Sequence, residues 1–315
     1  MNTDGTPILR IGQYCENVLY IKRDDLYPFS FGGNKARKAE LFFHEIDNSD
    51  YDCVVTYGSS SSNHCRVISN MAAARNMPCY IISPIESTEE TFNRKMMLLF
   101  GAKIEAVPLS DVHNAIENKL NDLKKRGQKP YFIPGGGHGN IGTQAYVNCY
   151  GEIKAWESKN YVHFDYIFHA SGTGTTQAGL VCGKLLNGDK REIIGISIAR
   201  KSPRGRDVII ESIKDYFASI GTAVSDASLE DSVVFCDLYV SGGYGLPASN
   251  EMIDRIMSRY GIPLDLTYTG KAFGGMTDYI KTKGIRNQNI LFIHTGGTPL
   301  FFDYLRKTDK DMHQK

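Results

Sequence analysis

The sequence has 315 residues, of which 42% are hydrophobic and 23% are charged, and its formal net charge is +1. These values are typical of a globular protein with one large or two ordinary domains, and the near-zero charge gives no electrostatic case for nucleic acid or an anionic membrane as partner. No apolar run reaches the length of a membrane span. The polar N-terminus lacks the apolar centre of a signal peptide, so we expect a cytoplasmic protein.

Strand-like and helix-like segments alternate along the chain. The predicted strands are 19–22, 53–57, 78–83, 103–107, 131–133, 166–170, 193–199, 233–237 and 290–294. The predicted helices are 36–46, 63–75, 88–100, 112–126, 141–157, 175–186, 207–220, 249–260 and 272–282. Because such alternation is typical of parallel sheets covered by helices, we expect an α/β fold. Its two lobes would be a large one, 1–38 plus 134–315, and a small inserted one, 39–133.

The seven cysteines are scattered, with no Cys-x-x-Cys pair and no His pair to complete a zinc site. Most lie in apolar stretches, where free cysteine behaves as a small hydrophobic residue. We therefore expect reduced core cysteines and no metal site. Cys65 stands apart because it adjoins a Ser-Asn-His segment.

A glycine pair, Gly32 and Gly33, follows the first predicted strand. Two glycines let the chain turn sharply and approach a ligand closely, and Asn34 is a good N-cap for the helix predicted over 36–46. Lys35 is therefore held at a corner, where a desolvated amine can form an imine with an aldehyde. A surface lysine at a basic helix start would have the same sequence, so the choice depends on three further segments.

The first of these segments, 172–176, lies between a predicted strand and a helix. A Gly-rich turn and a helix N-terminus form an anion site, and the hydroxyls of Thr173, Thr175 and Thr176 add donors. The P-loop pattern fails, and the dinucleotide fingerprint fails because the third glycine is Gly179. A single phosphate fits better than a pyrophosphate, and a plain helix-capping turn is the alternative.

The second segment is a serine run, 59–62, followed by Asn63 and His64. Its hydroxyls and amides are suited to a carboxylate, with help from the helix dipole, and a flexible helix cap is the alternative. A hydrolase is disfavoured, because adjacent helical side chains such as those of Ser62 and His64 do not face each other. No Gly-x-Ser-x-Gly elbow is present either.

The third segment comprises late Gly-rich turns at 241–245, 266–271 and 294–297. Glycines there imply close approach of the backbone to a ligand. Tyr244 and Tyr268 could stack on a ring or move protons, and buried structural tyrosines are the alternative.

Together these segments resemble the fold-type II pyridoxal-phosphate enzymes, and more narrowly the family of 1-aminocyclopropane-1-carboxylate deaminases and D-cysteine desulfhydrases. The likeness runs from about residue 19 to about residue 302. Its most specific parts are 22–25, 31–38, 62–64 and 268–271. The resemblance implies a two-lobed fold like that of the tryptophan synthase β chain, a homodimer, a small amino-acid substrate and the cofactor pyridoxal 5'-phosphate.

The resemblance also implies roles for individual residues. Lys35 would bind the cofactor covalently, Lys38 and the 172–176 loop would bind its phosphate, and Asn63 its ring hydroxyl. The implied cofactor-binding residues are Lys35, Lys38, Asn63, Gly172, Thr173, Gly174, Thr175, Thr176 and Thr269. The implied catalytic residues are Lys35, Ser62, Tyr244 and Tyr268. The residues implied at the substrate are Ser62, Asn63, His64 and Thr295.

Two positions discriminate within the family. The cyclopropane deaminases carry glutamate and leucine where this chain has Thr269 and Thr295, as in the desulfhydrases. A carboxylate at the pyridine nitrogen makes the ring a stronger electron sink than a hydroxyl does. The resemblance therefore implies β-elimination that releases ammonia and a 2-oxo acid. The alternatives are cyclopropane deamination, β-replacement on another amino acid, and non-catalytic binding of a phosphorylated metabolite. The unusual segment 28–30 leaves the substrate open.

Overall fold

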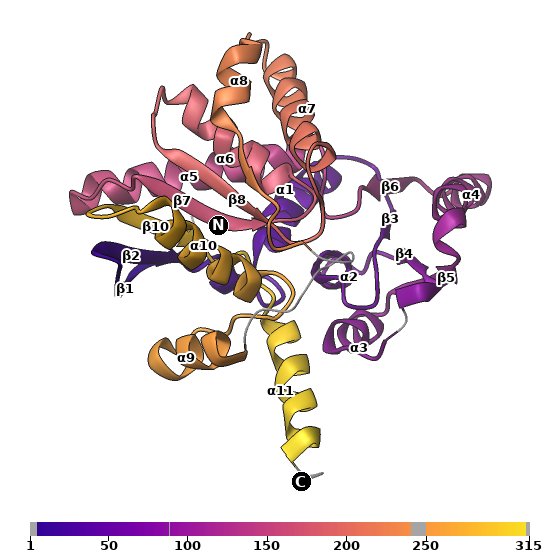
Figure 1. The fold of residues 1–315 in the computed structure, drawn as a ribbon. Helices are drawn as coiled ribbons and strands as arrows, with labels where there is room; N and C mark the ends of the chain where they lie inside the picture. The colour runs from indigo at the N-terminus through magenta and orange to yellow at the C-terminus, as the bar shows by residue number, and fades with distance from the viewer. Residues whose placement is uncertain (1–4, 88, 241–249, 313–315) are drawn as a thin grey trace.

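The computed structural model describes residues 5–87, 89–240 and 250–312, and its strands form two separate sheets (Figure 1). The strands are β1 (Ile8–Tyr14), β2 (Asn17–Lys22), β3 (Cys53–Tyr57), β4 (Cys79–Pro84), β5 (Lys103–Val107), β6 (Pro130–Ile133), β7 (Tyr166–Ser171), β8 (Glu192–Ser197), β9 (Val234–Cys236) and β10 (Asn289–Ile293). The helices are α1 (Asn34–Asp47), α2 (Asn63–Ala73), α3 (Phe92–Leu99), α4 (Val112–Lys125), α5 (Asn140–Asn160), α6 (Thr175–Leu186), α7 (Arg204–Ser219), α8 (Asp226–Ser232), α9 (Asn250–Tyr260), α10 (Thr269–Lys283) and α11 (Thr298–Met312). Short 3-10 helices are η1 (Asp24–Leu26), η2 (Ile85–Ser87) and η3 (Leu109–Asp111).

The larger sheet has the strand order β1-β2-β10-β7-β8-β9. Its neighbouring strands are parallel except β1, which pairs antiparallel with β2 at the edge. Both faces of the central strands are buried: Ile167 belongs to a buried cluster with residues of α5, α6 and α7, while the next residue, Phe168, belongs to another cluster with residues of α9, α10 and α11. Such double coverage explains why β7, β8 and β10 are nearly continuous apolar runs.

The smaller sheet has the order β5-β4-β3-β6 and is parallel throughout. Val54 of β3 packs with α1, α2 and α3, whereas its neighbours Cys53 and Val55 pack with Leu123 of α4 on the other face. Helix α1 also contacts α5 of the larger lobe. It therefore lies between the two sheets, which positions its first turn at their junction (Figure 1).

The predicted α/β fold with helix-covered parallel sheets is confirmed, with local differences. The edge strand β1 and the helices α8 and α11 were not predicted. Asn34 was expected to cap a helix over 36–46, and this was wrong: Gly33 is the N-cap, at φ 91°, and Asn34 begins α1. The helix expected over 88–100 begins at Phe92, because Thr91 caps it by accepting from the Arg94 amide at 3.1 Å. The lobe boundaries stay a prediction, although every strand of the smaller sheet lies within 39–133.

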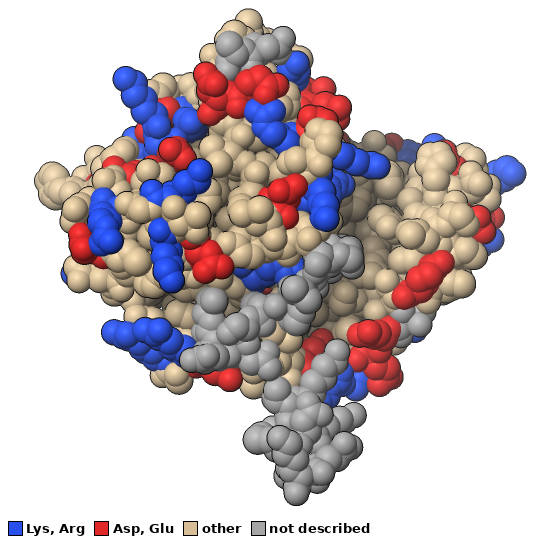
Figure 2. Space-filling view, viewed as in Figure 1, with Lys and Arg blue, Asp and Glu red and all other residues tan. Residues whose placement is uncertain are grey.

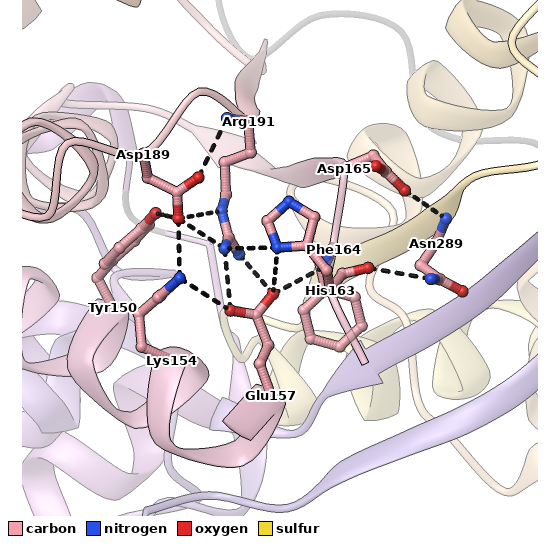
Figure 3. A network of polar contacts seen from close by, with 9 residues as sticks. All are labelled: Tyr150, Lys154, Glu157, His163, Phe164, Asp165, Asp189, Arg191 and Asn289. Atoms are coloured by element: carbon pink, nitrogen blue, oxygen red, sulfur yellow. Dashed lines mark hydrogen bonds and ion pairs between the residues drawn. The ribbon is translucent and has the colours of Figure 1, made fainter. Parts of the chain in front are cut away.

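A polar network closes the end of the larger sheet at which its parallel strands begin (Figure 3). The buried Arg191 donates to both oxygens of Glu157, at 2.8 and 2.9 Å, and to Asp189. Asp189 also accepts from the Tyr150 hydroxyl at 2.7 Å. These contacts join α5 to the loop before β8, opposite the strand ends at which ligands of such sheets lie.

Lys, Arg, Asp and Glu side chains are interspersed over the visible face, and no single sign dominates it (Figure 2). Within the part of the chain that the structure describes, no helix is both long and apolar enough to cross a membrane. All seven cysteines are free thiols, and five of them, including Cys65, are buried.

Candidate functional site

A cavity of about 810 Å³ lies where the strands of both sheets end. Tyr57 and Pro84 from the smaller sheet and Ser171 from the larger one are the last residues of their strands and contribute to its wall. The carboxyl ends of parallel strands are the usual position of ligand sites in α/β proteins. The predicted site residues that line the cavity are Lys35, Ser62, Asn63, His64, Gly172, Thr173, Gly174, Thr176, Tyr268 and Thr295.

Lys35 is placed by a glycine turn packed against the turn that follows β10. A Cβ on Gly33 would lie 2.7 Å from the Thr295 carbonyl oxygen, and the Asn34 amide donates to that oxygen at 3.0 Å. Lys35 Nζ donates to the Gly136 carbonyl at 2.9 Å. Burial lowers the pKa of this amine to about 8. A fraction of the Lys35 amine is therefore deprotonated at physiological pH.

Lys38 lies one turn further along α1, behind the cavity wall. Its side chain is buried, and its Nζ has no hydrogen-bond partner among the described residues. Burial, and then the neighbouring charge of Lys35, lowers the pKa of Lys38 well below its usual value. A buried ammonium without a partner is costly, so a bound anion nearby would stabilise it.

The 172–176 turn connects β7 to α6 beside Lys35. Gly174 adopts φ 93° and is the N-cap, so the first amides of α6 lack helical partners. A Cβ on Gly136 would lie 3.2 Å from Lys35 Nζ and 2.8 Å from Thr173 Cγ2. Lys35 and the 172–176 turn therefore both lie close to the backbone of Gly136. Together with Lys38, this turn has the chemistry of a phosphate site.

Three side chains from other segments form hydrogen bonds with this turn. Asn34 Nδ2 donates to Thr176 Oγ1 at 3.1 Å, Arg200 donates to the Thr173 carbonyl at 3.1 Å, and His138 Nδ1 lies 2.9 Å from Thr175 Oγ1. Thr175 itself is buried and does not line the cavity.

The opposite wall is the start of α2. Ser62 is its N-cap, and Ser62 Oγ accepts from the Cys65 amide at 3.1 Å. His64 Nε2 lies 2.8 Å from Thr56 Oγ1, whose only proton goes to the Ile133 carbonyl at 2.8 Å. The histidine nitrogen must therefore be the donor. Burial, followed by the charges of Lys35 and Lys38, lowers the pKa of His64 well below its usual value, so this ring is neutral.

Thr269 is the first residue of α10. Its hydroxyl donates to Asp265 Oδ1 at 2.8 Å, and Thr269 is buried outside the cavity lining. Asp265 also accepts from the amides of Thr267 and Tyr268, at 2.9 and 2.8 Å. Tyr268 lines the cavity, and a role for Thr269 at a ring nitrogen stays a prediction. Tyr244 lies outside the described residues.

Sequence patterns did not single out His138, Arg200, Asp265, Arg66 or Asn93. His138 stands in the glycine loop 135–139 and could have been suspected there. The other four look like ordinary polar residues in the sequence, and only the folded structure shows what they contact.

Comparisons with known proteins show which proteins this chain is similar to. The D-cysteine desulfhydrase of Yersinia enterocolitica is 33% identical over 305 residues, which cover 94% of this chain and 91% of that protein. The enzyme of the same name from Serratia proteamaculans is 32% identical over 308 residues, with the same shares covered.

Solved structures show the same fold. An ACC deaminase homologue superposes with a TM-score of 0.85 at 32% identity and covers 96% of this chain and 92% of its own. A hydrogen sulfide-producing enzyme from Fusobacterium nucleatum reaches a TM-score of 0.63 at 20% identity, covering 92% of this chain and 93% of its own, which shows the fold alone. A family model described as pyridoxal-phosphate dependent enzyme matches residues 2–296. The chain therefore belongs to the family of pyridoxal-phosphate dependent enzymes.

Proposed function

We propose that the protein is a pyridoxal-phosphate-dependent lyase that releases ammonia and a 2-oxo acid from a small β-substituted amino acid such as D-cysteine. The observation that supports this most is the Lys35 amine, which faces the cavity with a pKa lowered to about 8 by burial. The relatives named D-cysteine desulfhydrase, 33% identical over 94% of the chain, suggest the substrate.

The residues present fit the cofactor. Lys38 has a buried amine without a hydrogen-bond partner among the described residues, and the α6 N-terminus offers amides for the same anion. A phosphate there would give Lys38 a counter-charge and accept from those amides. Asn63 lines the cavity and would donate to the ring hydroxyl. Lys35 would form the covalent bond to the aldehyde.

The mechanism assigns two tasks to Lys35. Pyridoxal phosphate, when bound, supplies an electron-withdrawing ring that stabilises negative charge at the Cα atom of an attached amino acid. The Lys35 amine would hold the cofactor through its aldehyde, which requires the neutral form of the amine, and it is the group we assign to accept the Cα proton. A pKa lowered to about 8 by burial serves both tasks, because the neutral amine is then accessible near physiological pH.

The walls of the cavity would orient the substrate. The α2 N-terminus, with Ser62 as its N-cap, is suited to the substrate carboxylate, because helix N-termini attract anions. Tyr268 is our candidate for moving protons to and from the substrate. In the overall reaction, the Cβ–S bond breaks with its electron pair on sulfur. Cysteine and water thereby give hydrogen sulfide, ammonia and pyruvate.

Deamination of 1-aminocyclopropane-1-carboxylate is the second candidate, because a solved ACC deaminase homologue is 32% identical. The two candidates differ in the bond that breaks, a carbon–sulfur bond or a strained carbon–carbon bond.

The test is release of sulfide and 2-oxo acid by the purified, cofactor-loaded protein. We expect both products from D-cysteine in equal amounts, and none from a Lys35→Ala variant that still binds the cofactor. A matched control is Lys95→Ala, since Lys95 is an exposed residue of α3. Absence of 2-oxo acid with D-cysteine, L-cysteine and β-chloro-D-alanine would rule out the proposed lyase.

We further propose a homodimer, as the resemblance implies, and a cytoplasmic location. Light scattering of the purified protein would give its mass in solution, and cell fractionation its location. A monomeric mass, or recovery outside the cytoplasm, would contradict this part of the proposal.

A further inference from the structure

The side chain of Asn63 is fixed by two neighbours behind the cavity wall. Its Oδ1 accepts from Arg66 Nη1 at 2.7 Å and from Asn93 Nδ2 at 3.0 Å. A guanidinium has donors only, so the Asn63 atom that faces it must be the oxygen. The Asn63 NH2 group is thereby left to face the cavity that Asn63 lines.

The side chain of Asn93 is also fixed by hydrogen bonds at both its oxygen and its nitrogen. Its Oδ1 accepts from Arg66 Nη1 at 2.9 Å, and its Nδ2 also donates to the Ser61 carbonyl at 2.7 Å. Reversing the Asn63 amide would place its NH2 group against two donors. The network therefore permits one orientation, in which the cavity receives a donor.

Arg66 is the unusual member of this network. Its side chain is fully buried, its remaining partner is the Ser30 hydroxyl at 3.3 Å, and Nη2 has no hydrogen-bond partner among the described residues. In the described chain no carboxylate forms an ion pair with it. Burial lowers the pKa of Arg66 to about 9, so the group is still charged at neutral pH. A buried charge without a counter-ion favours an anion nearby.

We propose that Arg66 is a positioning residue that turns the Asn63 NH2 group toward the cavity and, through its uncompensated charge, favours an anionic oxygen bound there. The inference rests on the proposed function, in which that oxygen is the deprotonated ring hydroxyl of pyridoxal phosphate. Arg66 thereby sets the protonation state of the cofactor without contacting it.

Other titratable groups line the same cavity, and none of the variants used in the test below replaces them. They are Lys35 from α1, Tyr57 from β3, His64 from α2, Glu86 from η2, His138, Tyr268, and Arg200 and Glu211 beside and within α7. None of them is a hydrogen-bond partner of Arg66 among the described residues.

The test records the absorption spectrum of the loaded protein across the pH range in which it stays folded. In Arg66→Gln, the form with a protonated ring oxygen should persist to a pH about one unit or more higher than in the unmutated protein, because a nearby positive charge has been lost. Arg66→Lys, which keeps the charge, should move the spectrum less. Arg75→Met is the matched control, because Arg75 follows α2 but pairs with Asp47 at 2.6 Å, and it should leave the spectrum unchanged.

Asn93→Asp tests the charge without removing Arg66, since it places a carboxylate 2.9 Å from Nη1 in the present geometry. It should shift the spectrum in the same direction as Arg66→Gln. Spectra of the unmutated, Arg66→Gln and Asn93→Asp proteins that superimpose at every pH would overturn the proposal while leaving the proposed function intact. Failure of the unmutated protein to bind pyridoxal phosphate would overturn both.

Discussion

Lys35 and Lys38 lie on one face of α1, and burial lowers the pKa of both. For Lys35 the folded value of about 8 lies below the usual value of 10.5, so the amine is protonated below pH 8 and neutral above it. Only the neutral amine attacks an aldehyde. The rate at which the cofactor-free protein takes up pyridoxal phosphate should therefore rise up to about pH 8 and then level off.

Stopped-flow absorbance measures that rate. Borohydride reduction followed by peptide mass mapping identifies the modified residue, which should be Lys35. A rate that keeps rising toward pH 10.5, the ordinary lysine value, would show that burial does not tune this amine.

Lys38→Met should weaken cofactor binding without lowering the stability of the cofactor-free protein. Loss of a charge-assisted hydrogen bond to phosphate, ~1.5–3 kcal/mol, would weaken cofactor binding about tenfold or more. Without cofactor, the same change removes a buried amine whose Nζ has no hydrogen-bond partner among the described residues, so the free energy of unfolding should stay equal or rise. Equilibrium dialysis and urea unfolding measure the two quantities. Unchanged affinity would place the phosphate elsewhere.

Among the secondary-structure elements, helix α1 is held in position by buried ion pairs. Arg37 donates to Asp24 at 2.9 Å and to Glu152 of α5 at 3.0 Å, and Lys22 of β2 donates to Glu152 at 2.7 Å. Burial alone would raise the pKa of Asp24, but Arg37 and Lys22 hold it well below its usual range. The Asp24 carboxylate thus contributes stability at neutral pH that is lost on acidification through its lowered pKa.

Arg37→Met should therefore lower the free energy of unfolding by ~3–5 kcal/mol, because breaking this buried pair removes the main counter-charge of the Asp24 carboxylate. Arg126→Met is the matched control: Arg126 and Asp122 form an exposed pair, and the loss should be at most ~0.5 kcal/mol. Urea unfolding of cofactor-free protein compares the two. Equal losses would mean that the buried pairs do not hold α1 in place.

The limits of sequence patterns are clearest at this scale. The apolar run of β7 and the glycine turn before α6 correctly predicted a strand and a helix, because these patterns are local, and the anion site at that turn stays a prediction. Asn34 was assigned to a cap because it is a good capping residue, but its side chain reaches Thr176, 142 positions away. Arg66 was not singled out, since its contacts are to Ser30 and to Asn93 of α3, which are distant in the sequence. Edge strand β1 lacks the fully apolar pattern of the central strands, with Leu9 and Arg10 exposed.

Over the whole molecule, the cavity is built by both lobes, and its chemistry depends on how they meet. Thr295, which follows β10, lines the cavity. Thr269 is not among the lining residues, and its hydroxyl donates to Asp265. Neither residue brings a carboxylate to the ring-nitrogen position expected from the resemblance. Burial raises the pKa of Asp265, and its oxygens already accept from the 267–269 amides and the Thr269 hydroxyl. A Thr269→Glu change would place a second carboxylate beside this one, so it should be tested together with Asp265→Asn.

We therefore expect the unmutated protein to release 2-oxo acid faster from D-cysteine than from 1-aminocyclopropane-1-carboxylate. Expelling a thiolate needs less electron withdrawal than opening an unactivated cyclopropane, and a neutral hydroxyl supports a weaker electron sink than a carboxylate does. The assay measures 2-oxo acid release from each substrate at matched concentration, with Lys35→Ala as the blank. If the cyclopropane is turned over faster, the argument from Thr269 and Thr295 is wrong, and the second candidate, deamination of 1-aminocyclopropane-1-carboxylate, describes the reaction instead.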